Sequence, residues 1–249
     1  MVKIGGLKIL LDGSLGAHTA VLYEPYSDAP ETSGMLTYGR EDFEMLVFNG
    51  HKAGLQLAVH GIGDKAVDMA LKALEKALQK IPNADHRHRI EHASVLNEEL
   101  IRLMKRSGVI ASVQHHFTVS DFWVEDRLGK ERARWVYPFR SLMMTGIVLC
   151  GGSDCPVESI SPLLGIWAAV VRQRNSEECL TVEEAIRLNT VNAAYASFEE
   201  NLKGTIEEGK LADMVVLSDD PFKIKPEKIR DIKVLMTVVG GQTAHMGTV

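Results

Sequence analysis

The apolar residues of this chain follow two alternating patterns, short continuous runs and longer repeats at helical spacing. The short runs predict strands at residues 6–11, at 55–59, at the segment that ends at His92, at 109–113 and at 147–149. Between them, residues 42–53 and 65–80 predict helices; in the second, apolar residues fall on one face and charged residues on the other. Strands that alternate with helices predict an α/β fold built on a parallel sheet.

Polar residues indicate where several helices begin. Asp64 could cap the helix that follows it, and Asn97 is the predicted cap of the next one, with two glutamates in its first turn. Thr181 and Glu184 match a capping box that opens a further helix.

Two segments depart from the strand and helix alternation. Residues 120–140 are charged and aromatic, and a loop of this length inside a compact domain tends to be functional, so we expect it to form a wall over the site. Residues 204–217 and 232–239 predict short strands separated by turns. They suggest a small β appendage at the carboxyl end.

Three of the predicted strands run into side chains that bind metal ions. His60 follows the run 55–59, His92 ends the next strand, and Asp154 follows the run 147–149 after a Gly-Gly-Ser turn. In a parallel α/β structure, chemistry gathers at the carboxyl ends of the strands. Two imidazoles and a carboxylate that converge there suggest a metal site.

Composition and charge argue against several classes of partner. The chain has 249 residues and a net charge of −5, so it offers no basic face for nucleic acid and no polybasic segment for a membrane. Its start lacks an apolar signal core, and charges interrupt every apolar run before membrane-spanning length. We therefore expect a soluble cytoplasmic protein. Cys150, Cys155 and Cys179 form an odd and widely spaced set, which indicates reduced thiols.

Together these segments resemble the amidohydrolase superfamily, and within it amidohydrolase family 3, the group related to N-substituted formamide deformylase. Five pieces carry the resemblance: Lys8 through Asp12-Gly-Ser-Leu-Gly, His60-Gly-Ile-Gly-Asp64, Arg89-Ile-Glu-His92-Ala, Gly152-Ser-Asp154-Cys-Pro, and Gly204 through Asp213. Each piece alone is weak evidence. Five in the right order, spread over nearly the whole chain, form a specific signal.

The resemblance implies a metal-dependent-hydrolase (β/α)8 barrel with one or two divalent metal ions at its mouth, zinc being the expected metal, and a β-sandwich built from both chain ends. By position, Lys8 resembles the fourth-strand lysine that is often carboxylated to bridge two metals. His60 and His92 resemble the metal ligands of the fifth and sixth strands. Asp154 resembles the eighth-strand aspartate, which commonly binds metal and accepts the proton of the attacking water.

One departure from the family pattern concerns the first strand. Family members carry a His-X-His pair there, whereas this chain begins almost at the lysine strand. We therefore expect a truncated amidohydrolase, with barrel strands four to eight in residues 1–200 and the carboxyl-terminal part of the sandwich in residues 201–249. Five strands cannot close a barrel, so we expect self-association, a partner chain or distortion of the sheet to cover the open edges.

The predicted metal ligands also have structural interpretations. A lone histidine at a strand end is more often a hydrogen-bonded structural residue than a ligand. The Lys8 side chain could simply extend into solvent. Asp154 could cap the segment that follows it.

The residues expected around the metal site have alternatives as well. His115 and His116 could contact substrate or form a solvated loop pair, and Arg140 could hold a substrate carboxylate or carbonyl or form a surface salt bridge. Asp64 and Glu91 are near the ligands in sequence and could orient their imidazoles.

The resemblance implies a hydrolase that cleaves a C–N bond of a small molecule, an amide or N-formyl group, with metal-activated water. The alternative is an inactive fragment or pseudo-enzyme that lacks the first-strand ligands. An unrelated phosphate-binding module is disfavoured, because the glycine-rich turns lack the lysine and serine of a phosphate loop.

Overall fold

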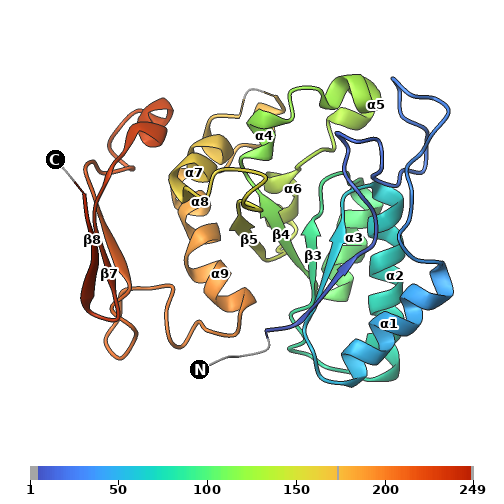
Figure 1. The fold of residues 1–249 in the computed structure, drawn as a ribbon, viewed down its shortest axis with the longest axis horizontal. Helices are drawn as coiled ribbons and strands as arrows, with labels where there is room; N and C mark the ends of the chain where they lie inside the picture. Colours follow the sequence, from blue (N-terminus) through green and yellow to red (C-terminus); the bar gives the residue numbers. More distant parts are fainter. Residues whose placement is uncertain (1–4, 173, 248–249) are drawn as a thin grey trace. The chain divides into compact units, whose positions relative to one another are not determined.

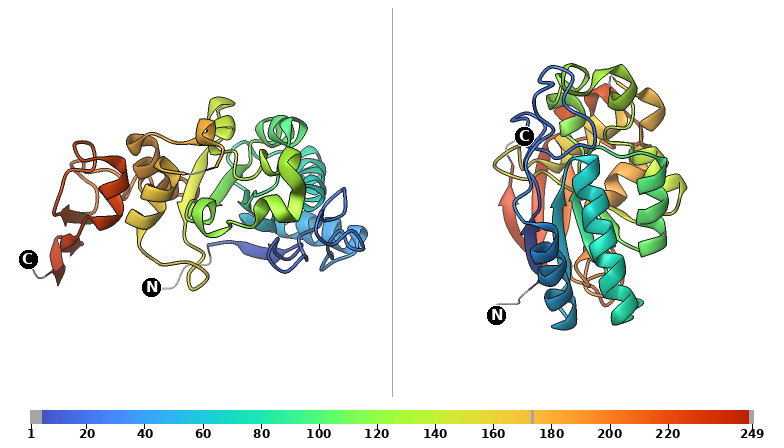
Figure 2. Two further views of the ribbon diagram at one scale, coloured as in Figure 1. Left: turned by 90° about the horizontal axis from the view of Figure 1, so that it is seen from above. Right: turned by 90° about the vertical axis from the view of Figure 1, so that its right-hand side faces the viewer.

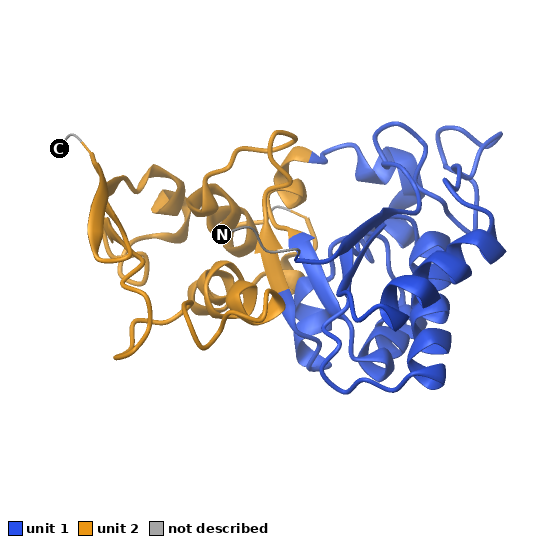
Figure 3. Cartoon of the chain, turned by 60° about the horizontal axis from the view of Figure 1, so that its bottom comes forward, with its two compact units in different colours: residues 1–113, 121–149 blue, residues 114–120, 150–249 orange. Residues whose placement is uncertain are grey.

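The computed structural model describes residues 5–172 and 174–247, and the chain divides into two compact units (Figure 3). Unit 1 comprises residues 1–113 and 121–149, and unit 2 comprises residues 114–120 and 150–249. The short segment 114–120 belongs to unit 2 because it packs on a later helix; the Thr118 hydroxyl donates to the carbonyl of Ala168 at 3.2 Å.

Five strands form one sheet in the order in which they occur along the chain: β1 (Leu7–Leu10), β2 (Leu57–Gly61), β3 (Arg89–His92), β4 (Ile110–Gln114) and β5 (Leu149–Gly152). The β1/β2, β2/β3 and β3/β4 pairs are parallel. The predicted α/β fold with a parallel sheet is therefore confirmed, with strand bounds shifted by a few residues. Among the described strands, β1 and β5 end the order, so this sheet is open.

Three helices of unit 1 cover one side of its strands. They are α1 (Arg40–Lys52), α2 (Asp64–Lys80) and α3 (Glu98–Ser107), and they lie side by side in Figure 1 and in the right-hand view of Figure 2. Leu71 and Leu74 of α2 are fully buried, and burying one leucine side chain contributes about 1.5–3 kcal/mol. The apolar face predicted for this helix is its packing face.

Two of the three predicted helix caps are present as expected. Oδ1 of Asn97 accepts from the Leu100 amide at 2.9 Å at the start of α3. The Thr181 and Glu184 capping box is complete at the start of α8 (Val182–Asn189). At α2, however, Gly63 occupies the cap position, and Asp64 is the first helical residue.

The segment 120–140 is mostly helical rather than an irregular loop. It runs from α4 (Phe117–Ser120) through α5 (Val124–Ala133) to the start of α6 (Phe139–Met144). Within unit 1, α5 holds the loop that follows β1: the Ser27 amide donates to the Arg127 carbonyl at 2.8 Å, and Nη2 of Arg132 donates to the Pro25 carbonyl at 2.8 Å.

Unit 2 combines helices with a small antiparallel sheet. Its helices are α4, α7 (Pro162–Val170), α8, α9 (Val191–Ala196) and the 3-10 turns Ser176–Glu178 and Pro226–Asp231. The sheet has the order β6 (Met214–Leu217), β7 (Val234–Val239) and β8 (Gln242–Met246). The first two strands fall inside the predicted β segments, whereas β8 was not predicted.

Two smaller findings bear on the environment of the protein. No helix in the described part of the chain is both long and apolar enough to cross a bilayer. Cys150, Cys155 and Cys179 are free thiols, as predicted.

Candidate functional site

His60 lies near the carboxyl end of β2, and it is on the same face of the sheet as every second residue of that strand. It is paired in register with Leu10 on β1 and Glu91 on β3, and it is 9% exposed. Nε2 of its ring lies 2.9 Å from the Gly13 carbonyl oxygen and 3.4 Å from Oδ1 of Asp12. The loop that follows β1 therefore holds one nitrogen of this ring.

His92 is the last residue of β3, where the chain leaves the sheet. Its φ of +75° is in the left-handed region, and that of the next residue, Ala93, is +45°. The His92 side chain is buried, and its ring centroid lies 4.3 Å from that of His60 in an edge-on arrangement. The structure thus brings the two predicted histidines together; their role as metal ligands stays a prediction.

Asp12 joins the two loops around His60. Its carboxylate accepts from the amides of Val21, Ile62 and Gly63 at 2.9, 3.1 and 2.9 Å. Burial raises the pKa of Asp12 above its ordinary value, although these backbone donors and His60 act in the opposite direction. Asp12 belongs to the segment from Lys8 through Asp12-Gly-Ser-Leu-Gly, but the sequence alone did not indicate its role, because these contacts join residues far apart in the chain.

Lys8 lies on β1, paired in register with Ala58, and its side chain is exposed. Lys8 lies two positions before Leu10, the residue of β1 that pairs with His60, so both are on the same face of the sheet. Two positions correspond to about 6.6 Å along the strand. The exposure agrees with the structural alternative for Lys8. Its role as a carboxylated ligand stays a prediction.

Asp154 belongs to unit 2, two residues beyond the end of β5. It is exposed, its φ is +55°, and its carbonyl accepts from the Val157 amide at 2.9 Å in a turn. The turn supports a local structural role for its backbone. Its carboxylate remains the predicted base and metal ligand.

His115 is a buried residue of unit 2, in contrast to a solvated loop histidine. It is 1% exposed, and burial lowers its pKa to about 4, which keeps the imidazole neutral. Its ring lies directly against Gly151 of β5 and Gly165 of α7, since a Cβ at those positions would lie 2.0 Å and 3.0 Å from ring atoms. This packing places His115 in the core of the unit.

His116, the next residue, is half-buried and pairs through Nδ1 with the carboxylate of Glu158. Glu158 follows β5, as Asp154 does, so the loop after this strand contributes a carboxylate that orients the His116 ring. No sequence motif pointed to Glu158, because the pair spans two loops.

The three remaining candidates lie in unit 1. Arg140 is half-buried on α6. Glu91 forms an ion pair with Arg89 at 2.7 Å. Asp64 accepts from the amides of Tyr23 and Lys65 at 3.0 and 2.8 Å, so it anchors the loop after β1.

The donor chemistry around His60 suits a divalent metal ion only in part. Two adjacent imidazoles at strand ends are typical ligands for such an ion. Within residues 5–172 and 174–247, however, no group of three or more His, Cys, Asp or Glu side chains is placed to hold a metal. His60 and His92 therefore fit as one part of a ligand set.

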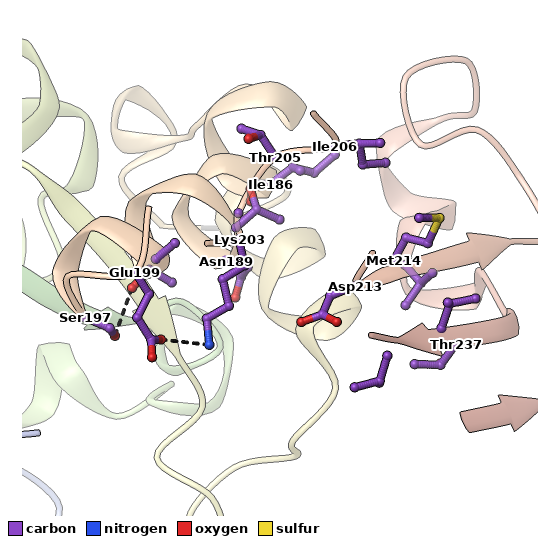
Figure 4. A pocket seen from close by; sticks show the side chains of 17 residues that line it. Ile186, Asn189, Ser197, Glu199, Lys203, Thr205, Ile206, Asp213, Met214 and Thr237 are labelled. Atoms are coloured by element: carbon purple, nitrogen blue, oxygen red, sulfur yellow. Dashed lines mark hydrogen bonds and ion pairs between the residues drawn. The ribbon is translucent and has the colours of Figure 1, made fainter. Parts of the chain in front are cut away.

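A separate cavity of about 740 Å³ lies inside unit 2, between α8, α9 and the strands β6 and β7 (Figure 4). Its wall is largely apolar, and its charged groups are partly paired, since Lys203 forms an ion pair with Glu199 at 2.7 Å. None of the residues predicted from the sequence for the metal or substrate site lines it.

Comparison with known proteins places this geometry in context. The sequence pattern of the amidohydrolase family matches residues 1–245. The Bacillus subtilis (strain 168) protein named "Putative amidohydrolase YtcJ" is 41% identical over 255 residues, covering 98% of this chain and 47% of the relative. N-substituted formamide deformylase of Arthrobacter pascens is 30% identical over 250 residues, covering 97% of this chain and 45% of the relative.

A solved structure agrees with the sequence matches. An uncharacterized metal-dependent hydrolase from Pyrococcus furiosus superposes with a TM-score of 0.81 at 40% identity, covering 88% of this chain and 45% of that chain. This chain thus spans about half the length of the proteins it resembles, with 47% and 45% of the two relatives covered.

Proposed function

Because this chain belongs to the amidohydrolase family, we propose that it carries part of the active site of a metal-dependent hydrolase that cleaves a C–N bond of a small molecule, such as an amide or N-formyl group. The observation that carries the proposal is the contact between the His60 and His92 imidazoles at the carboxyl ends of neighbouring parallel strands. The two relatives, named as an amidohydrolase and a formamide deformylase, support the reaction class.

In this proposal His60 and His92 hold a divalent metal ion, zinc being the expected one, and Lys8 and Asp154 supply further ligands. A bound divalent ion lowers the pKa of coordinated water toward ~7 and polarises the scissile carbonyl. Its ligands must be deprotonated, so both imidazoles bind as neutral groups.

The remaining steps belong to side chains of this chain. The Asp154 carboxylate accepts the proton of the attacking water as the new C–O bond forms. It then gives that proton to the leaving nitrogen as the C–N bond breaks. His116, oriented at Nδ1 by Glu158, and Arg140 bind polar groups of the substrate. The buried His115 packs against Gly151 and Gly165 and thereby supports the turn that carries His116.

Metal analysis with matched variants tests the proposal. We expect the purified protein to take up zinc, His60→Asn and His92→Asn to abolish the uptake, and His245→Asn, on the exposed face of β8, to leave it unchanged. Asp154→Asn should reduce hydrolysis of N-formyl amines or amides by about 10²–10⁴-fold. If zinc uptake is unchanged in both His60→Asn and His92→Asn, these two histidines do not form the metal site.

A second candidate function is non-catalytic association with another chain. The observation in its favour is β1, which ends the strand order and exposes Lys8 and Leu10, the latter by 54%. Sedimentation analysis would support it if Leu10→Asp converts a dimer or complex to a monomer. For either function we propose a cytoplasmic protein, because the three cysteines are free.

A further inference from the structure

The hydrogen-bond partners of His60 determine which ring nitrogen carries the hydrogen. Nε2 lies 2.9 Å from the Gly13 carbonyl oxygen. A carbonyl can only accept, so Nε2 must be the donor. A neutral imidazole with its hydrogen on Nε2 has its lone pair on Nδ1, and Nδ1 is then the atom that can bind a metal.

The Asp12 carboxylate stabilises the same arrangement. Its Oδ1 lies 3.4 Å from Nε2 of His60, close enough for the negative charge to favour a hydrogen on that nitrogen. Oδ1 also accepts from the Ile62 amide, and Oδ2 accepts from the amides of Val21 and Gly63. Because both oxygens are engaged and the side chain is 0% exposed, Asp12 is unsuited to bind a metal itself.

Asp12 also determines where the Gly13 carbonyl lies. Ile62 and Gly63 directly follow β2, and Val21 lies in the loop that follows β1, so one carboxylate ties both loops together. The loop has little freedom to shift: a Cβ at Gly63 would lie 2.0 Å from the Val21 carbonyl oxygen, and one at Gly13 would lie 2.1 Å from Oγ1 of Thr19.

We propose that Asp12 is a positioning residue that, with the Gly13 carbonyl, holds His60 as the Nε2–H tautomer and presents Nδ1 to a divalent metal ion. This inference rests on the proposed function, in which His60 is a metal ligand. Partners that orient a ligating histidine in this way fix its tautomer and raise its basicity, and their loss costs about 10–100-fold in metal affinity.

The tautomer can be measured without metal and without any variant. Long-range ¹H–¹⁵N correlation spectra of the metal-free protein distinguish a protonated from a bare ring nitrogen. We expect the His60 signals of a neutral ring protonated at Nε2. A ring protonated at Nδ1 would overturn the inference, whatever the protein does with metals.

Zinc titration of two matched variants then separates positioning from general loop anchoring. Asp12→Asn removes the charge next to His60, whereas Asp64→Asn removes a carboxylate that anchors the same loop and is bound to Tyr23 and Lys65. We expect zinc to shift the Nδ1 resonance of His60 in the native protein, Asp12→Asn to weaken zinc binding about 10–100-fold, and Asp64→Asn to leave it nearly unchanged.

The outcomes distinguish this inference from the proposed function. Equal losses in both variants would overturn the positioning role, because any loop anchor would then suffice. If the native protein binds no zinc, the proposed function fails, while an Nε2–H tautomer that is lost in Asp12→Asn still supports the positioning of the ring. If Asp12→Asn does not fold, the native tautomer alone decides.

Discussion

Nδ1 of His51 lies 2.9 Å from Nε2 of His88 in the buried part of unit 1. The Leu57 amide donates to Nδ1 of His88 at 3.0 Å, so a neutral His88 carries its hydrogen on Nε2 and donates it to His51. His51 then carries its own hydrogen on Nε2, which lies 2.7 Å from the Ile81 carbonyl oxygen. Backbone groups thus fix both tautomers.

A third histidine extends this arrangement. Nδ1 of His86 accepts from the His88 amide at 2.9 Å, and its Nε2 lies 3.0 Å from the Ser107 carbonyl oxygen. Burial, together with the neighbouring imidazoles His86 and His51, lowers the pKa of His88 to about 3. Burial also lowers the pKa of His86. His51, His86 and His88 form one cluster, and protonation of His86 and His88 would break the hydrogen bonds that their Nδ1 atoms accept from the His88 and Leu57 amides.

These shifts predict that the protein loses stability in mild acid. A histidine whose pKa is lowered on folding contributes its full stability above the unfolded value of about 6.5, and that stability is lost as the pH falls toward 3. Each such imidazole contributes up to about 1.4 kcal/mol per pH unit in this window. Urea unfolding between pH 7.5 and 4.5 should show the loss, to which His115 adds because its pKa is also lowered.

The variant His88→Gln separates this cluster from other titrating groups. It should lower the free energy of unfolding at pH 7.5, because the Leu57 amide loses its acceptor, and it should flatten the pH dependence. His245→Gln, on exposed β8, should change stability by less than about 0.5 kcal/mol. An unchanged slope in His88→Gln would contradict the assignment.

Two adjacent glycines of β5 are expected to respond differently to the same substitution. A Cβ at Gly151 would lie 2.0 Å from Cε1 of His115, whereas a Cβ at Gly152 would meet no atom within 4 Å. We expect Gly151→Ala to destabilise the protein by about 1–3 kcal/mol, because the buried ring must move. Gly152→Ala should stay within about 0.5 kcal/mol in a urea unfolding experiment.

A double-mutant cycle tests whether His115 is the cause. In a His115→Ala background the ring is gone, so adding Gly151→Ala should cost much less than it does in the native protein, with a coupling of about 0.5–3 kcal/mol. Purely additive effects would show that another contact limits space at Gly151.

The sequence predicted the strands and the pairing of His60 with His92 because both depend on local pattern. An apolar run that ends at a histidine identifies the strand end, and parallel strands place such ends together. The three acceptor contacts of Asp12 and the pairing of His51 with His88 have no local pattern. They arise from contacts between residues far apart in the chain, so only the folded chain reveals them.

The same distinction explains His115 and His116, which are identical neighbours in the sequence. In the turn that follows β4, the His115 ring packs into the core against Gly151, whereas the His116 ring lies beside the Glu158 carboxylate. Sequence reasoning treated them as a pair, since what separates them lies on β5 and the loop that follows it.

Arg132 of α5 predicts how firmly the loop after β1 is held. Its guanidinium donates to the carbonyls of Glu24 and Pro25 at 3.1 and 2.8 Å and to the Ser27 hydroxyl at 3.0 Å. Hydrogen bonds to charged groups contribute at most about 1.5–3 kcal/mol each, and water reduces that contribution here, because these bonds are exposed. Because the three bonds act on one short segment, Arg132→Met should let residues 24–28 open locally without unfolding unit 1.

We expect the amides of residues 24–28 in Arg132→Met to exchange about 10–100-fold faster in hydrogen–deuterium exchange, while β2 and β3 keep their protection. Arg134→Met is the matched control on the same segment, since its ion pair with Glu131 is exposed and local. Equal exchange in the two variants would mean that other contacts hold the loop without Arg132, among them the Ser27 amide on the Arg127 carbonyl and the ion pair of Arg127 with Asp28.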